Sequence, residues 1–506
     1  MIPRTSYRFN ILMKICSYFF MLLSVTLPFI ACKNTKISTS TQESKKPNIV
    51  YILTDQWRGS ALGYAGDVNV RTSNLDAFAK ESVNFTNAVS VTPVCTPHRA
   101  ALLTGKYPTT TGMFLNDIYL PSEELCMAEI FKTAGYNTGY IGKWHLDGHG
   151  RENNVAPERR QGFDYWKGSE CDHNYNKEHY YANNDPEKKY WEGYSPFAIT
   201  KDANQYIANH ANDKNPFLLV VSLATPHFPH VSAPQKYKDM YPEKDLKLAP
   251  NVTDDMKDRV RKELQGYYAH ATATDEMIGS LLEQIKKLNL LENTIIVFTS
   301  DHGEMMGAHG VKPFTKQLAW DESVRVPFLI RYPNIEKNKG ATINAPINTP
   351  DILPTLLGLT NINIPKTIEG SDLSNLIKNP DPDFDRAALI MGVSPFGINY
   401  NDPAYRAVRT KQYTYERTVN GPSMLFDNVK DPYQMNNLVN KPAFKTLQDN
   451  LEGQLQVALK KIGDDFKPKE YYMQKFNFTL DPQRNAIAYL SWENGQQGVV
   501  ASPKRN

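Results

Sequence analysis

The sequence predicts an α/β fold with a large, mostly parallel sheet sandwiched by helices, followed by a smaller C-terminal α+β subdomain with an antiparallel sheet. Three observations lead to this prediction. Between residues 47 and 384, short β-branched segments alternate with helical patterns, which is typical of a parallel sheet covered on both faces. Beyond about residue 385, strand-like segments follow one another through Asn-Gly and Asp-Pro turns. The chain of 506 residues is also too long for one ordinary core.

Four apolar segments predict buried strands of the large sheet. They read NIVYIL, NTGYIG, PFLLVVSLA and TIIVFT, and helical patterns lie between them, among them SNLDAFAKESV and AEIFKTAGY. Each strand runs directly into polar residues: Thr54-Asp55-Gln56, Lys143-Trp144-His145, Thr225-Pro226-His227 and Ser300-Asp301-His302-Gly303. One aspartate after a strand is usually a turn or cap residue. Four such endings predict a ligand site, because the carboxyl ends of parallel strands meet at one edge of the sheet.

The polar residues at these strand ends include a set of cation ligands. Asp55 and Asp301 offer carboxylate oxygens, Gln56 an amide oxygen, and His302 an imidazole nitrogen. An oxygen-rich set favours Ca²⁺ or Mg²⁺ over Zn²⁺, which prefers Cys and His. A divalent cation beside lysine and arginine side chains would form a site for a tetrahedral oxyanion.

The segment CTPHRAALLTG places Cys95 at the start of a predicted helix. Pro97 suits the first turn, and Gly105 is a C-terminal cap. A helix N-terminus favours an anion, so Cys95 is either a reactive group or, on the plainer interpretation, a buried structural cysteine.

The N-terminus predicts export. Basic residues precede the apolar run ICSYFFMLLSVTLPFIAC, so residues 1–31 are interpreted as a signal peptide of the lipoprotein type. Ala31-Cys32 resembles a bacterial lipobox, which makes Cys32 the candidate lipid-anchored residue, and plain secretion is the alternative. Residues 32–46 are a polar tether, 47–384 the catalytic domain, 385–480 the C-terminal subdomain and 481–506 a tail. We expect a periplasmic or outer-membrane lipoprotein of a Gram-negative bacterium.

Composition and cysteine count narrow the function further. A net charge of +3 gives no support for nucleic-acid binding. Apart from Cys16 and Cys32, three cysteines remain, so at least one thiol has no intramolecular partner. A pairing of Cys126 with Cys171 would leave Cys95 as the odd one, but the sequence does not decide it.

The chain resembles the sulfatase family of the alkaline-phosphatase-like superfamily, most of all the carbohydrate sulfatases of Bacteroidetes. CTPHRAALLTG resembles the family signature, and PNIVYILTDQWR, GYIGKWHLDGHG, PHFPH, FTSDHGEMMGAHG and DESVRVPFLIRYP resemble further family blocks in the same order. The resemblance spans about residues 47–440. It implies that a maturation enzyme converts Cys95 to formylglycine (3-oxoalanine), an aldehyde whose hydrate is the nucleophile.

The resemblance also implies roles for the other site residues. Asp55, Gln56, Asp301 and His302 would hold one Ca²⁺. Arg99 would stabilise the hydrate, and Lys143 and Lys316 would neutralise the sulfate oxygens. His227 is the candidate general acid on the departing sugar oxygen, and His145 would remove a proton from the second hydroxyl so that sulfate is expelled.

The expected substrate is a sulfated carbohydrate, cleaved by exo action, with galactose 4-O-sulfate favoured. The aromatic and polar segment 166–185 is either an ordinary surface loop or part of a sugar site, in which Asp172 and His173 are the candidates. Two alternatives stay open. One is a phosphatase or phosphonate monoester hydrolase of the same superfamily, and the other is a non-catalytic glycan-binding lipoprotein.

Overall fold

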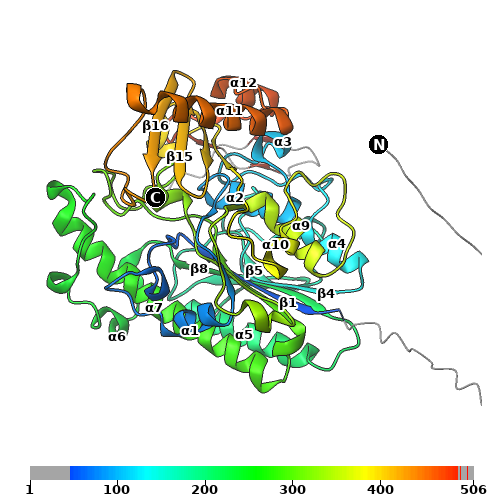
Figure 1. Ribbon diagram of the computed structural model, residues 1–506. Helices are drawn as coiled ribbons and strands as arrows, with labels where there is room; N and C mark the ends of the chain where they lie inside the picture. Colours follow the sequence, from blue (N-terminus) through cyan, green and yellow to red (C-terminus); the bar gives the residue numbers. More distant parts are fainter. Residues whose placement is uncertain (1–45, 488–489, 492–497, 500–506) are drawn as a thin grey trace, which may run out of the picture. The chain divides into compact units, whose positions relative to one another are not determined.

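The computed structural model describes residues 46–487, 490–491 and 498–499, which belong to one compact unit (Figure 1). The predicted signal peptide, Cys32, almost all of the tether and much of the predicted tail lie outside the described residues. Among the helices of the described part, none is both long and apolar enough to span a bilayer.

A ten-stranded sheet forms the centre of the fold. Its four central neighbours are the four strands that the sequence predicts, in the order β9 (Thr294–Ser300), β1 (Asn48–Asp55), β8 (Phe217–Pro226) and β4 (Asn137–Lys143). All three pairings among them are parallel. One flank continues through β10 (Phe328–Arg331), β2 (Val83–Phe85) and β11 (Thr342–Ile343), and the other through β5 (Tyr165–Ser169), β6 (His179–Ala182) and β7 (Asp185–Tyr190).

The central strands are buried on both faces, which explains why they are apolar throughout. All eight residues of β1 are buried. Tyr51 and Leu53 belong to one core cluster, whereas Val50 and Ile52 belong to the other, because successive side chains of a strand point to opposite faces. Each such buried aliphatic side chain stabilises the fold by about 1.5–3 kcal/mol.

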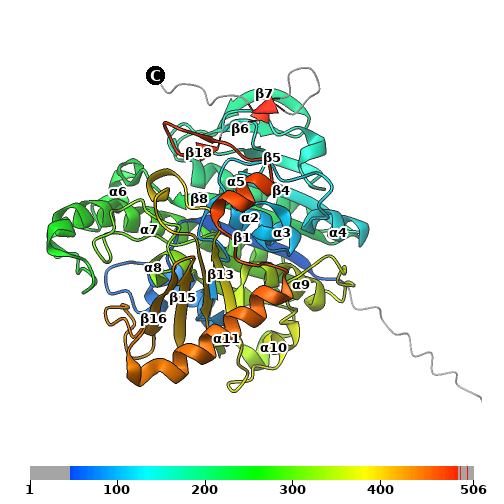
Figure 2. The same ribbon diagram turned by 90° about the horizontal axis from the view of Figure 1, so that it is seen from above.

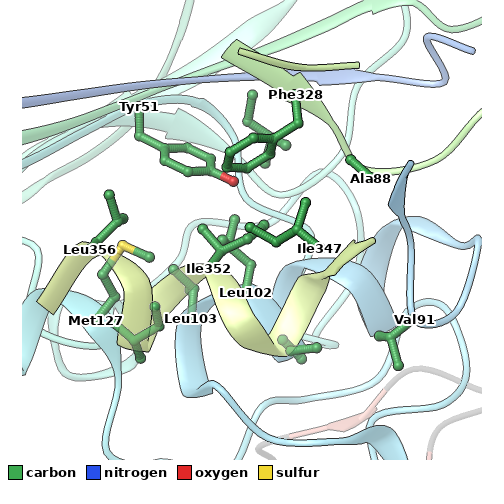
Figure 3. Close-up of a cluster of buried hydrophobic side chains, with 14 of the residues drawn as sticks. Tyr51, Ala88, Val91, Leu102, Leu103, Met127, Phe328, Ile347, Ile352 and Leu356 are labelled. Atoms are coloured by element: carbon green, nitrogen blue, oxygen red, sulfur yellow. The ribbon is translucent and has the colours of Figure 1, made fainter. Parts of the chain in front are cut away.

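Helices cover both faces of the sheet (Figure 1). α1 (Ser73–Lys80), α5 (Ser195–His210) and α7 (Lys257–Lys287) bury their apolar sides in the core that contains Val50. α2 (Cys95–Thr104), α4 (Met127–Thr133) and α9 (Thr349–Leu359) pack in the core that contains Tyr51. Figure 3 shows this second layer, in which Leu102 of α2 and Ile352 of α9 lie beneath Tyr51 and Phe328 of the sheet. The predicted sandwich is confirmed.

The C-terminal part contains a separate antiparallel sheet, as predicted. Its strands are β13 (Ala388–Gly392), β14 (Tyr405–Arg409), β15 (Tyr413–Thr418) and β16 (Gly421–Asp427). The amphipathic helix α11 (Lys445–Lys461) lies along this sheet (Figure 2) and buries Leu451, Leu455 and Leu459, which are spaced to share one helix face. The domain boundary at residue 385 stays a prediction.

The segment 166–185 is more regular than the surface loop that the sequence allows. β5 and β6 pair in antiparallel fashion, and β6 pairs with β7, so the segment extends the large sheet at one edge. Aromatic packing stabilises these strands, since Tyr180 of β6 stacks on Trp191 with the ring centroids 4.6 Å apart. Asp172 and His173 lie in the turn between β5 and β6.

Candidate active site

The carboxyl ends of the four central strands bring the predicted site residues together. Asp55 is the last residue of β1 and Lys143 the last of β4, while Asp301 and His227 directly follow β9 and β8. Cys95 is the first residue of α2, whose C-terminal cap is Gly105 with a left-handed φ of 66°. Parallel strand order therefore gathers, at one edge of the sheet, residues that lie far apart in the sequence.

Cys95 lies in the middle of a candidate cation site. One ligand atom each of Asp55, Cys95, Asp301 and His302 lies within 4.8 Å of all the others, and all four residues are buried. The Cys95 Sγ is 3.2 Å from the Nε2 of His302. The Nδ1–H of His302 donates to the carbonyl of Gly303 at 2.9 Å, so Nε2 is the ring nitrogen that faces the site.

Gln56 adds an amide oxygen to this cluster. Its Nε2 donates to the buried carboxylate of Glu304, so its Oε1 points the other way and lies 3.3 Å from the Nζ of Lys316. Its backbone has a left-handed φ of 65°, a conformation that costs free energy outside glycine and is often found at functional sites. Two carboxylates, one amide oxygen and one imidazole nitrogen fit a hard divalent cation.

Arg99 compensates the buried negative charge. It lies four residues after Cys95 on α2, on the same face of the helix. Its Nη2 and Nε donate to Asp301 Oδ2 at 3.0 and 3.2 Å, and its Nη1 donates to the Lys143 carbonyl at 2.9 Å and to the Ser222 hydroxyl at 2.8 Å. Since Asp301 is fully buried, this pairing avoids an uncompensated charge in the core.

Two lysines surround the centre of the site. The Nζ of Lys143 is 2.5 Å from Asp55 Oδ2 and 3.3 Å from His173 Nε2. The Nζ of Lys316 is 3.3 Å from Cys95 Sγ and 3.2 Å from both His227 Nε2 and His302 Nε2. Burial and Asp55 disfavour a Cys95 thiolate, but Lys143, Lys316 and His302 together hold the pKa of the thiol well below its usual value. The arrangement concentrates positive charge where an oxyanion would bind.

His227 faces this centre in one defined tautomer. Its Nδ1–H donates to the carbonyl of Phe228 at 2.7 Å, so Nε2 is the nitrogen on the side of Lys316. Burial, together with His173 and Lys316, holds the pKa of His227 well below 6.5, which keeps the ring neutral. His173 stacks on His227 with the ring centroids 4.0 Å apart.

The two weaker candidates of the sequence separate in the structure. His173 joins the cluster through Lys143 and His227. Asp172 instead accepts hydrogen bonds from the Nδ1 of His179 at 2.6 Å and from the backbone N–H groups of His179 and Asn174. It therefore shapes the turn that carries His173.

His145 lies next to the site in a left-handed conformation with φ 61°. Its Nε2 is 2.9 Å from Oδ1 of Asp117, a residue that sequence reasoning missed. Cys171 and Asp117 raise the pKa of His145 well above its usual value, against the effect of burial. Asp117 lies in the loop LNDIYLP, where one aspartate reads as an ordinary turn residue.

Gln317 is a second residue that the sequence did not indicate. Its side chain forms a reciprocal pair with the backbone of Phe396, in which Nε2 donates to the carbonyl at 3.1 Å and Oε1 accepts from the N–H at 3.1 Å. The Tyr405 hydroxyl donates to the Gln317 carbonyl at 2.9 Å. Because Gln317 has a left-handed φ of 78° and follows Lys316 directly, these contacts from the C-terminal part fix the position of Lys316.

The other two cysteines of the described residues are free thiols. Cys126 and Cys171 are both buried and unpaired, so the pairing that the sequence left open is absent from the described residues. Cys171 lies 3.8 Å from His173 Nε2.

Comparisons with known proteins agree with this site. A family model described as "Sulfatase" matches residues 47–362, and one described as "N-sulphoglucosamine sulphohydrolase, C-terminal" matches residues 307–461. A Formosa agariphila protein named "Ulvan-active sulfatase" is 65% identical over 493 residues, which cover 97% of this chain and 96% of that protein. An "Endo-4-O-sulfatase" of Bacteroides thetaiotaomicron is 30% identical, with 84% of this chain and 94% of that protein covered.

A solved structure of the sulfatase yidJ from Bacteroides fragilis superposes with a TM-score of 0.76 and 32% identity, over 86% of this chain and 99% of that one. The predicted resemblance is thereby confirmed over most of the chain. The chain belongs to the sulfatase family, with an alkaline-phosphatase-like fold, and it is a sulfuric ester hydrolase.

Proposed function

We propose that this enzyme removes sulfate from a carbohydrate with a formylglycine at position 95 and one bound Ca²⁺. The observation that carries the proposal is the buried cluster of Cys95, Asp55, Asp301 and His302, with Lys143 and Lys316 on its sides. The hydrate of a formylglycine aldehyde supplies a nucleophilic hydroxyl. A divalent cation held by Asp55, Gln56, Asp301 and His302 supplies positive charge for the sulfate oxygens.

The protein side chains position the ester and move protons. Lys143 ends β4 and Lys316 lies in the loop after β9, so they can bind the sulfate oxygens from two directions and balance the charge that develops on them. Arg99 holds the Asp301 carboxylate in place through its two donors.

His227 is the proposed acid for the departing sugar oxygen, and the proton would pass from Nε2, because Nδ1 is committed to Phe228. Since the neutral ring carries its only proton on Nδ1, Nε2 would first take up a proton from the Nζ of Lys316, which lies 3.2 Å away. The half-buried His173 stacks on this ring and restricts its rotation. His145 is the proposed base that takes a proton during release of sulfate.

We propose a sulfated polysaccharide of the ulvan type as the substrate source, on the strength of the relative that is 65% identical over 493 residues and is named for activity on ulvan. The preference for galactose 4-O-sulfate stays a prediction. A relative named as a 4-O-sulfatase supports the position of the sulfate, but that relative is named as endo-acting, whereas we predict exo action.

A substrate panel tests this proposal. Purified enzyme would be given ulvan oligosaccharides, galactose and N-acetylgalactosamine 4- and 6-sulfates, an aryl sulfate and a phosphate monoester, and released anion would be measured. We expect turnover of sulfated sugars well above the aryl sulfate and the phosphate ester. A phosphate ester turned over fastest would instead support the phosphatase alternative.

Export with a lipid anchor at Cys32 and maturation by a formylglycine-generating enzyme complete the proposal. The sequence motifs around Cys32 and Cys95 support them.

A further inference from the structure

Asp117 is tied to both sides of the active site. Its backbone has a left-handed φ of 63°, which is costly for a residue other than glycine. Its N–H donates to the Thr96 hydroxyl at 3.3 Å, and this hydroxyl donates to the His145 carbonyl at 2.9 Å. Thr96 directly follows Cys95, so the loop around Asp117 is held against the nucleophile segment and the His145 segment together.

The carboxylate of Asp117 accepts three hydrogen bonds, from His145 and Arg151. Oδ1 accepts from His145 Nε2 at 2.9 Å and from Arg151 Nε at 2.8 Å, and Oδ2 accepts from Arg151 Nη2 at 2.8 Å. The side chain is almost buried, which disfavours its charge, yet Arg151 and His145 hold the pKa of Asp117 well below 3.8. The bidentate contact also fixes the plane of the carboxylate.

A carboxylate that is ionised accepts and does not donate, so the proton between the two residues is on His145 Nε2. Nδ1 is then the nitrogen that can take up a further proton. This nitrogen is buried, and no group in the part of the chain that the structure describes meets hydrogen-bond geometry with it, although the Cys171 side chain lies near the ring. A buried ring nitrogen without a partner is costly unless a ligand or a reacting group uses it.

We propose that Asp117 is the positioning residue of His145: it fixes the Nε2–H tautomer and presents Nδ1 as the proton acceptor. The inference rests on the proposed role of His145 as a base. When Nδ1 takes a proton, the ring becomes an imidazolium and its original hydrogen stays on Nε2. The fixed Asp117 carboxylate then stabilises this positive charge without moving.

Several charged groups surround His145, and the expected pH effect must include all of them. Asp117, Cys171 and Glu170 favour the imidazolium, whereas Lys143 opposes it, and Arg151 acts by neutralising Asp117. Removal of the Asp117 charge leaves the other groups in place. It therefore lowers the affinity of His145 for its proton.

The test compares Asp117→Asn with His145→Gln in kcat measured from acid to alkaline pH. We expect His145→Gln to lose on the order of 10²- to 10⁴-fold in kcat. Asp117→Asn should lose about 10- to 100-fold, with KM little changed, and the acid limb of its pH profile should move to lower pH. Asp464→Asn is the matched control, because Asp464 is a buried partner of Arg406 at 2.6 Å in the C-terminal part, and its pH profile should not move.

The outcomes separate the inference from the proposed function. If His145→Gln keeps full activity, the role of His145 in the proposed function is wrong. If His145→Gln loses activity but Asp117→Asn keeps the wild-type kcat and acid limb, the inference about Asp117 alone is overturned.

A second measurement does not depend on the folding of the variants. Nitrogen NMR of the ¹⁵N-histidine-labelled wild type, with the His145 signals identified by their loss in His145→Gln, reports which ring nitrogen carries the proton at alkaline pH. We expect the Nε2–H form. An Nδ1–H form would overturn the proposal.

Discussion

Replacing Gln317 with alanine tests whether the C-terminal part of the chain positions Lys316. The variant removes the reciprocal pair of hydrogen bonds between the Gln317 side chain and the Phe396 backbone, each 3.1 Å long, and leaves Lys316 itself unchanged. Two such bonds contribute about 2 kcal/mol in total to the free energy of unfolding.

These two hydrogen bonds also hold the strained segment that carries Lys316, so their free energy sets how strongly that segment is restrained. If all of it acts on that segment, the fraction of molecules with Lys316 in place falls by up to about 30-fold, since 1.4 kcal/mol corresponds to a factor of ten. We expect kcat/KM on a sulfated sugar to fall by about this factor at most, and the free energy of unfolding, measured in urea, to fall by about 2 kcal/mol.

Gln434→Ala is the matched control for this experiment. Gln434 also bridges two loops, since its Nε2 donates to Asn428 at 2.8 Å and its Oε1 accepts from the Asp321 N–H at 2.8 Å, but neither contact involves Lys316 or its neighbours. The control should lose similar stability and keep the wild-type kcat/KM. Equal kcat/KM in Gln317→Ala and Gln434→Ala, at equal loss of stability, would refute the reasoning.

Four further predictions concern the centre, the metal, the anchor and the second sheet. Cys95→Ala should abolish turnover while circular dichroism and Tm stay close to the wild type; any residual turnover would contradict the role of position 95. Asp301→Ala, or chelation of the wild type, should remove both the bound Ca²⁺, measured by elemental analysis, and the activity; full activity in metal-free enzyme would argue against the cation. A fatty-acid analogue should label the wild type and not Cys32→Ala, and an unlabelled mature wild type would leave secretion alone. Burial raises the pKa of Glu416 to about 7, although Ser423 donates to it. The folded state therefore binds this proton more tightly, and the stability that it contributes at low pH is lost as the pH rises toward 7. Glu416→Gln should raise Tm at pH 8 relative to the wild type and change it little at pH 4, and an equal shift at both pH values would contradict the assignment.

Much of the site followed from the sequence because it lies on regular elements. A buried parallel strand needs a continuous apolar run, so the sequence predicts β1, β4, β8 and β9. Because these strands run in the same direction, the residues that follow them meet at one edge of the sheet. Cys95 was visible for the same kind of reason, since a helix start is marked by Pro97 and its end by Gly105.

The site residues that the sequence does not indicate lie in loops with irregular backbone conformation. Asp117 and Gln317 adopt left-handed φ values of 63° and 78°, and each is placed by contacts from segments distant in the sequence. Local propensity does not indicate such positions, because aspartate and glutamine in polar loops are ordinary. The sequence of segment 166–185 indicates only a loop or part of a sugar site for a related reason: its short edge strands are stabilised by pairing and by aromatic stacking that only the folded chain brings together.

The mass of the tryptic peptide that carries Cys95, taken from enzyme made in its native host, tests the central claim most directly. The same preparation would be assayed on a sulfated sugar, so that the modified fraction and the specific activity are measured together. We predict an aldehyde in place of the thiol at position 95, with specific activity proportional to the modified fraction across preparations. A fully active preparation in which this peptide retains an unmodified cysteine would contradict the account.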